Sequence, residues 1–335
     1  MRRAPIACAL LVLALTAAAG CGEKSEKGGG EAERFDLALD FYVNPDHAGI
    51  YAALDRGLFE EAGLDVRPQV PSDPAAPIKQ VAAGRADLAI SYEPEVLLAR
   101  DQGLDVVAVG ALVQDPLTSL ISLGDAGIAD PADLEGKTIA TAGIPYQDAF
   151  LDAILARENL RRDDVSVVDV GLNLLPAVLS GRADAMLGGF RNVEGVDLEL
   201  RGEDPVVVPV DELGIPTYDE LVLVAGERRV EDDPEAIRLF LAALEQGTRI
   251  AVRDPQLATD AILDAGQGLD PKLTAAEVEA TLPLLASHGS RRYGFMDPGE
   301  WERFIGFMAD EGEIGVRFEP GEVLTNELLP GEIPD

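Results

Sequence analysis

Strand-like and helix-like segments alternate along most of this chain, and this alternation limits the possible folds more than any other feature of the sequence. Short apolar runs such as "ADLAIS" and "DVVAVGAL" have the length and composition of buried strands. Segments with helical apolar spacing lie between them, such as "AGIYAALDRGLFEEAG" and "EPEVLLARDQG", and several of these end at glycine. Strands that alternate with helices predict an α/β fold with parallel sheets covered on both faces.

A repeated turn indicates two similar lobes. The segment "KQVAAGRADLAIS" ends a helix at Gly84 and starts a strand, and "PAVLSGRADAMLGG" does the same at Gly181. Glycine adopts the left-handed conformation that ends helices, although a generic helix-to-strand turn would also explain each copy alone. Because "DELVLVAGERRV" has the pattern of a strand returning to the first lobe, we expect lobe 1 at residues 35–118 and 219–335 and lobe 2 at 119–218. Two connections between lobes predict a hinge with a cleft beside it.

The N-terminal segment has the pattern of a lipoprotein signal. Arg2 and Arg3 precede an apolar run that ends in small residues before Cys21. A transmembrane anchor or a core helix is the alternative, but the run is shorter than the roughly 20 residues that span a bilayer. We therefore expect a signal peptide at residues 1–20, a lipid on Cys21 and a Gly-rich tether at 21–34. This arrangement predicts a body held at the extracytoplasmic face of the cell membrane.

Charge and motif searches exclude several functions. The net charge of −34 disfavours binding to nucleic acid and to anionic lipid surfaces, although it also fits an ordinary soluble surface. The phosphate-loop remnant "LEGKT" precedes its strand, and "SHGS" at residues 287–290 lacks the geometry of a nucleophile elbow. His47 and His288 do not show metal-ligand spacing, so no metal site is expected.

The segment order resembles the type II solute-binding proteins of ABC importers. The opening "LDFYVNPDHAGIYAALDRGLFEEAGLDV" is similar to that of the NMT1/THI5-like branch, which binds pyrimidine precursors of thiamine. Other similar segments are "VGALVQDPLTSLISL", "GKTIATAGIPYQ", "GGFRNVEGVDLE" and "PTYDELVLVA", and the resemblance extends from residue 35 to about 312. It implies a type II periplasmic-binding-protein fold with two α/β lobes and a two-crossover hinge. It also implies a small heteroaromatic ligand, a membrane permease as partner and no cofactor, and we expect a monomer.

Two segments depart from the family pattern. The family often has a tryptophan followed by a non-aromatic residue where this chain has Phe41 and Tyr42. Its second-lobe segment often reads Gly-Gly-Tyr-Trp-Asn, where this chain has Phe190, Arg191 and Asn192. The departures leave open a relative of the usual pyrimidine with a group that Arg191 can meet.

Ligands of open α/β sheets bind beyond the carboxyl ends of strands, where loops enter helices. That rule selects segments 40–47, 91–93, 143–147 and 190–194, together with the two crossovers. Aromatic faces there offer stacking area, and Asn44 and Asp46 offer hydrogen bonds, although Phe41 and Tyr42 could instead be core residues and Asp46 a helix cap. The predicted ligand-binding residues are Asp40, Phe41, Tyr42, Asn44, His47, Ser91, Tyr92, Thr118, Ser119, Gly143, Tyr146, Phe190, Asn192, Glu194, Tyr218 and Glu220.

The resemblance implies roles for two of these residues. Asn192 and Glu194 would meet the ring nitrogen and the exocyclic amine of a stacked pyrimidine, although Glu194 could instead be a carboxylate that complements a helix dipole. Riboflavin, a sulfonate or nitrate remain alternative ligands. Fungal pyrimidine synthases share this fold and use a lysine for pyridoxal phosphate, a histidine and an iron-binding cysteine cluster. Ser91 and Glu95 occupy the lysine and histidine positions, and the cluster has no counterpart, so a binding protein and not an enzyme is expected.

Overall fold

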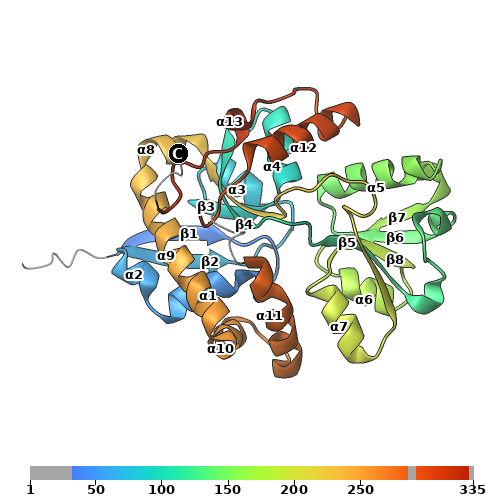
Figure 1. The fold of residues 1–335 in the computed structure, drawn as a ribbon, viewed down its shortest axis with the longest axis horizontal. Helices are drawn as coiled ribbons and strands as arrows, with labels where there is room; N and C mark the ends of the chain where they lie inside the picture. The colour runs from blue at the N-terminus through green and yellow to red at the C-terminus, as the bar shows by residue number, and fades with distance from the viewer. Residues whose placement is uncertain (1–31, 286–291, 332–335) are drawn as a thin grey trace, which may run out of the picture. The chain divides into compact units, whose positions relative to one another are not determined.

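Two five-stranded sheets form the centres of two lobes, and the chain passes between them twice (Figure 1). A computed structural model describes residues 32–285 and 292–331. The lobe 1 sheet has the order β2-β1-β3-β10-β4 and comprises β1 (Glu33–Ala38), β2 (Leu64–Gln69), β3 (Leu88–Ser91), β4 (Val106–Val113) and β10 (Leu221–Gly226). The lobe 2 sheet has the order β7-β6-β8-β5-β9 and comprises β5 (Thr118–Leu123), β6 (Thr138–Thr141), β7 (Ser166–Asp169), β8 (Ala185–Phe190) and β9 (Pro205–Pro209).

Helices cover both sheets, so the two-lobe α/β architecture expected from the sequence is confirmed. The lobe 1 helices are η1 (Pro45–His47), α1 (Ala48–Asp55), α2 (Leu58–Glu61), α3 (Pro77–Ala82), α4 (Glu93–Asp101), α8 (Glu227–Asp232), α9 (Pro234–Arg253), α10 (Pro255–Ala265), α11 (Pro271–Leu285), α12 (Pro298–Asp310) and α13 (Pro320–Val323). The lobe 2 helices are α5 (Pro145–Arg157), α6 (Leu174–Leu179) and α7 (Glu194–Arg201), with short 3₁₀ turns η2 (Gly124–Ala126), η3 (Pro131–Leu134) and η4 (Arg162–Asp164).

In each sheet, the strand next to one edge strand runs antiparallel to both of its neighbours, whereas the sequence predicted parallel sheets. β10 is antiparallel to β3 and β4, and β5 is antiparallel to β8 and β9. Both strands follow a crossover directly, so each enters its sheet from the edge that faces the other lobe. The remaining adjacent pairs, β1 with β2 and β3 and β6 with β7 and β8, are parallel as expected.

The repeated turn makes the same contact in both lobes. The glycine of each turn has a left-handed conformation, with φ of 63° and 68°, which ends α3 and α6. In lobe 1 the Asp87 carboxylate accepts from the Asp36 backbone N–H at 2.7 Å, and the Asp87 N–H donates to the Asp36 carbonyl at 2.8 Å. In lobe 2 Asp184 makes the equivalent pair with Thr138 at 2.7 and 2.8 Å. The turn therefore hydrogen-bonds the start of β3 to β1 in lobe 1 and the start of β8 to β6 in lobe 2.

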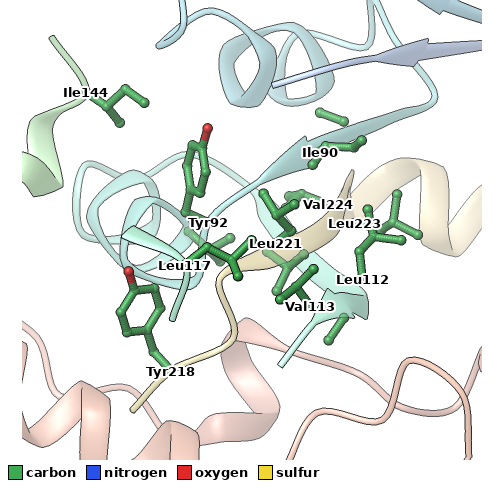
Figure 2. Close-up of a cluster of buried hydrophobic side chains, with 14 of the residues drawn as sticks. Ile90, Tyr92, Leu112, Val113, Leu117, Ile144, Tyr218, Leu221, Leu223 and Val224 are labelled. Atoms are coloured by element: carbon green, nitrogen blue, oxygen red, sulfur yellow. The ribbon is translucent and has the colours of Figure 1, made fainter. Parts of the chain in front are cut away.

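Apolar packing holds lobe 1 together. All residues of β4 are buried although β4 is an edge strand, and Leu324 forms an isolated parallel bridge with Ala108 of this strand. The Phe240 ring of α9 stacks on Phe35 of β1 and Phe59 of α2, with ring centroids 5.1 and 5.0 Å apart. Figure 2 shows buried side chains of β3, β4 and β10 packed together, with Leu117 and Tyr218 from the crossovers at one end of the cluster.

The boundaries expected for the tether and the two lobes can be placed relative to the strands of the structure. β1 begins at Glu33, inside the segment expected as a tether, and the lobe boundaries expected at 118/119 and 218/219 fall at the start of β5 and just before β10. The predicted signal peptide, Cys21 and His288 lie outside the described residues. Within residues 32–285 and 292–331, no helix combines the length and apolar character needed to cross a membrane.

Candidate functional site

A cavity lies between the two lobes, at the carboxyl ends of β1, β3, β6 and β8, and its empty space, counted together with its opening to solvent, is about 400 Å³. Loops at these strand ends place side chains from both lobes on its wall. The lining residues from lobe 1 are Asp40, Phe41, Asn44 and Tyr92, and those from lobe 2 are Ala142, Ile144, Tyr146, Gln147, Leu174, Gly188, Phe190, Val193 and Glu194. The set combines aromatic rings, two carboxylates and two amides, and none of these described lining residues is basic.

Asp40 is held in place by two neighbours. Its Oδ1 lies 2.9 Å from Nε2 of His47, and its Oδ2 accepts from the Tyr92 hydroxyl at 3.1 Å. His47 Nδ1 accepts from the backbone N–H of Asn44 at 3.3 Å, which places the ring proton that faces Asp40 on Nε2. His47 is fully buried and does not line the cavity. It therefore orients the Asp40 carboxylate instead of forming part of the cavity wall.

Glu194 is the second carboxylate of the cavity. It is the first residue of α7, and its Oε2 accepts from the backbone N–H of Phe190 at 2.7 Å. Burial raises the pKa of Glu194 to about 7, although the backbone hydrogen bonds act in the opposite direction. A carboxyl group with this pKa can hold or release a proton near neutral pH.

Gln147 fills the wall beside Gly188. Its Oε1 accepts from the backbone N–H of Ala142 at 2.8 Å. Gly188 has φ of 113°, and a Cβ at that position would lie 2.2 Å from Gln147 Nε2. The absence of a side chain at residue 188 is therefore what allows the amide of Gln147 to reach the wall.

Aromatic side chains from the two lobes meet at the cavity. The Tyr92 and Tyr146 rings are tilted by 50°, with centroids 5.3 Å apart. Figure 2 shows Tyr92 beyond the end of β3 and Ile144 on a separate segment of lobe 2. Phe41 and Phe190 add apolar surface to the same wall. A flat heterocycle could contact several of these faces.

The predicted residues of the two crossovers form a hinge cluster and do not line the cavity. Glu220 Oε2 accepts from the backbone N–H groups of Leu117 and Thr118 at 2.7 Å each and from the Tyr218 hydroxyl at 2.9 Å. Glu220 Oε1 accepts from the Thr118 hydroxyl at 2.9 Å, and the Ser119 hydroxyl donates to the Leu117 carbonyl. The carboxylate of Glu220 thus joins one crossover to the other.

Four further predicted residues also lie off the cavity wall. Tyr42 is 51% exposed and faces a separate surface depression, and the Ser91 hydroxyl donates to the buried carboxylate of Glu95. Gly143 has φ of 74° and turns the chain beside Asp169. Asn192 binds lobe 1 side chains, as detailed below.

Arg191 is also directed elsewhere, since its Nε donates to the Pro116 carbonyl at 3.1 Å. A ligand group that meets Arg191 is therefore not supported by this arrangement.

The sequence-based prediction did not single out several of the lining residues. Gln147 ends a segment expected at the cleft, and Leu174 follows β7, so the strand-end rule could have identified both. Gly188 lies within β8, and only its positive φ distinguishes it. In the described part of the chain, no group of three or more His, Cys, Asp or Glu side chains is arranged to hold a metal ion.

Two α/β lobes, a double crossover and a cavity between the sheets define the periplasmic-binding-protein fold. The alkanesulfonate-binding protein SsuA from Xanthomonas axonopodis pv. citri superimposes with a TM-score of 0.69 at 15% identity, over 89% of this chain and 99% of that one. The profile of the family described as NMT1/THI5 like matches residues 44–258. The chain belongs to this NMT1/THI5-like family, as the sequence resemblance indicated.

Curated relatives match most of the chain. A Haemophilus influenzae protein whose name assigns it to thiamine biosynthesis is 36% identical over 84% of this chain and 88% of its own length. The formylaminopyrimidine-binding protein of Halalkalibacterium halodurans is 34% identical over 89% of this chain and 91% of its own. The 4-amino-5-hydroxymethyl-2-methylpyrimidine phosphate synthase of Schizosaccharomyces pombe is 26% identical over 89% of this chain and 88% of its own.

Proposed function

We propose that this protein is an extracytoplasmic solute-binding lipoprotein of an ABC importer and that it binds a small pyrimidine between its lobes. The ligand class is a thiamine precursor such as a hydroxymethyl- or aminomethyl-pyrimidine. The observation that carries the proposal is the cavity, whose walls combine aromatic rings with the carboxylates of Asp40 and Glu194. The name of the Halalkalibacterium halodurans relative supports the same ligand class.

The chemistry of the walls matches an aminopyrimidine. Aromatic faces of Phe41, Tyr92 and Phe190 can contact the two faces of a planar ring. An exocyclic amine donates hydrogen bonds, and carboxylates are strong acceptors for such donors. Glu194, with a pKa of about 7, can accept from the amine or share a proton with an adjacent ring nitrogen.

Anionic ligands are less favourable in this cavity. A sulfonate or nitrate would lie near two carboxylates, and none of the described lining residues supplies a positive charge. Like charges at short range repel strongly inside a protein. The similarity to the alkanesulfonate-binding protein therefore supports a shared fold, and it does not support an alkanesulfonate as the ligand of this chain.

We propose binding without catalysis, although more distant relatives are named as pyrimidine phosphate synthases. The residue at the position of the synthase lysine is Ser91, and its hydroxyl is used in a bond to Glu95. Ser91 has no amine for a Schiff base, and it does not line the cavity.

Substitution of Glu194 tests the ligand assignment. A hydrogen bond to a charged partner contributes roughly 1.5 to 3 kcal/mol, so Glu194→Gln should weaken pyrimidine binding about tenfold to a hundredfold in calorimetric titrations. Glu199→Gln is the matched control, because Glu199 is exposed on the same helix. The panel contains hydroxymethyl- and aminomethyl-pyrimidines, riboflavin, taurine and nitrate. Binding of taurine or nitrate without any response to pyrimidines would contradict the proposal.

Membrane attachment is a separate part of the proposal. Its support is the sequence from Arg2 to Cys21, which lies outside the described residues. A single lipid chain binds a bilayer only marginally, so a stably anchored protein needs a multiply acylated terminus. Cys21→Ser should move the folded protein from the membrane fraction to the soluble fraction, where it should retain ligand binding. Retention in the membrane pellet after a salt wash would contradict the lipoprotein assignment.

The proposed partner that receives the ligand is a membrane permease, and the proposed oligomeric state is a monomer.

A further inference from the structure

Asn192 forms a bridge between the lobes. It follows β8 of lobe 2, and its Nδ2 donates to Asp46 Oδ1 and to Thr281 Oγ1, both at 2.8 Å. Asp46 belongs to η1 and Thr281 to α11, both in lobe 1. All three residues are buried. We refer to Asp46, Asn192 and Thr281 as the interlobe bridge.

Two oxygens of the bridge lack hydrogen-bond partners among the described residues. They are Asp46 Oδ2 and Asn192 Oδ1, and both are fully buried. An unpaired buried acceptor costs about 1 to 3 kcal/mol, and more when it is charged. The two oxygens belong to side chains that one hydrogen bond already joins. A proton on one of them would supply the donor that the pair lacks.

The groups around Asp46 act on its pKa in both directions. Asp40 of its own loop, Glu194 of α7 and Glu277 of α11 favour the protonated form, while α1 and α10 add no charge effect. His47 and the hydrogen bond from Asn192 favour the ionised form. Nε2 of His47 faces Asp40 and not Asp46. Burial is the largest of the effects that together raise the pKa of Asp46 to about 7. Burial likewise raises the pKa of Glu277 to about 8.

We propose that Asp46 is protonated on Oδ2 when the lobes are joined, and that its O–H donates to Asn192 Oδ1 to complete a paired acid–amide bridge. The proton comes from solvent and returns to solvent when the lobes separate. Asn192 is then a positioning residue for closure and does not meet a ring nitrogen of the ligand. The inference rests on the proposed function to the extent that closure accompanies ligand binding.

The variant Asp46→Asn mimics the protonated acid, because its amide N–H replaces the O–H and its carbonyl still accepts from Asn192. A closed-state pKa near 7 and an ordinary carboxyl pKa in the separated state predict proton uptake on closure below neutral pH. Between pH 6 and pH 8, wild-type affinity for hydroxymethyl-pyrimidine should therefore fall about tenfold more than the affinity of Asp46→Asn. Titration of the ligand itself affects both proteins equally and cancels in this comparison.

Two further variants separate the bridge from its surroundings. Glu277→Gln removes the neighbouring titratable group on α11, and the difference in pH profile between this variant and the double variant Asp46→Asn/Glu277→Gln should persist. Asn192→Ala removes both bridge bonds and should bind weakly at every pH. Identical pH profiles for wild type and Asp46→Asn would overturn the inference. So would a flat profile produced by Glu277→Gln alone.

An infrared measurement keeps this inference separate from the proposed function, because it reports the carboxyl proton directly and does not depend on affinity. Difference spectra between wild type and Asp46→Asn at pH 6 are recorded without ligand and with excess hydroxymethyl-pyrimidine. At least one of them should contain the C=O band of a protonated carboxyl group, and that band should disappear above pH 8. Its absence from both spectra at pH 6 would overturn the inference even if pyrimidines bind. Its presence, combined with no pyrimidine binding at any pH, would support the bridge and refute the proposed ligand.

Discussion

Phe41 and Tyr42 are adjacent in the sequence but face different surroundings. Phe41 lines the interlobe cavity, whereas Tyr42 is 51% exposed and faces a depression shared with Val70 and Leu269. We expect Phe41→Ala to weaken pyrimidine binding roughly three- to tenfold, because an aromatic contact contributes about 0.5 to 1.5 kcal/mol beyond area burial. Tyr42→Ala should leave the dissociation constant unchanged. Calorimetric titration of both variants checks this, and a weaker Tyr42→Ala would place that ring at the ligand.

At the residue scale, the sequence could predict which loops approach the cavity but not where each side chain points. The strand-end rule selected Asp40, Tyr92 and Glu194, and all three line it. Ser91 and Tyr92 are neighbours at the end of β3, where successive side chains point to opposite sides, so only one of them can reach the cavity. The direction of such a pair depends on tertiary packing, which residue type and spacing do not encode.

The two crossovers are short elements with one shared carboxylate. Glu220→Ala would leave the N–H groups of Leu117 and Thr118 and the Tyr218 hydroxyl without their acceptor. Each unpaired buried donor costs about 1 to 3 kcal/mol, so the loss of acceptor for these three donors should lower the free energy of unfolding by about 3 to 9 kcal/mol. Glu95→Ala is the matched control, because among the described residues the one side chain that donates to this buried carboxylate is Ser91.

Denaturant unfolding of both variants measures the difference. Glu220→Gln should recover most of the stability, since its amide oxygen can replace Oε2 and its amide nitrogen can donate to Thr118. Equal losses for Glu220→Ala and Glu95→Ala would show that the hinge cluster contributes no more than an ordinary buried carboxylate.

At the scale of helices and strands, the periodicity of the sequence predicted most elements but not which strands run antiparallel to their neighbours. The apolar spacing of α9 and the aliphatic run of β4 are visible in the sequence. Strand periodicity is the same in both directions, so the antiparallel placement of β5 and β10 could not be read from it. The helix expected from residue 48 onward is interrupted at Gly57, whose φ of 67° separates α1 from α2.

Across the whole molecule, buried carboxyl groups predict an unusual dependence of stability on pH. Burial is the largest cause that raises the pKa of each of five groups to about 7 or 8, and these groups are Asp46, Glu95, Glu194, Asp219 and Glu277. Between an ordinary carboxyl pKa near 4 and these values, the folded state binds more protons than the unfolded state. Their contribution to stability is therefore greatest at low pH and is lost as the pH rises through 7 to 8.

We expect the melting temperature to fall by several degrees between pH 6 and pH 8.5 in thermal unfolding. Exposed carboxylates are ionised throughout this range, so surface repulsion in this acidic chain changes little. Asp219→Asn should flatten the profile, because the asparagine oxygen can still accept from the Trp301 indole N–H that Asp219 binds. A melting temperature that rises over this range would contradict the assignment of these protons to the folded state.

The cavity wall is divided between the lobes, and this division affects the kinetics of release. Under the proposed function, a ligand held there leaves when the Tyr92–Tyr146 contact and the Asn192 bridge separate. Its residence time is therefore limited by the rate of lobe opening as well as by its own contacts. A permease that binds the outer surfaces of both lobes and holds the lobes apart would release the ligand without competing for its binding site. Release would then depend on contacts at the protein surface and not on the chemical identity of the ligand.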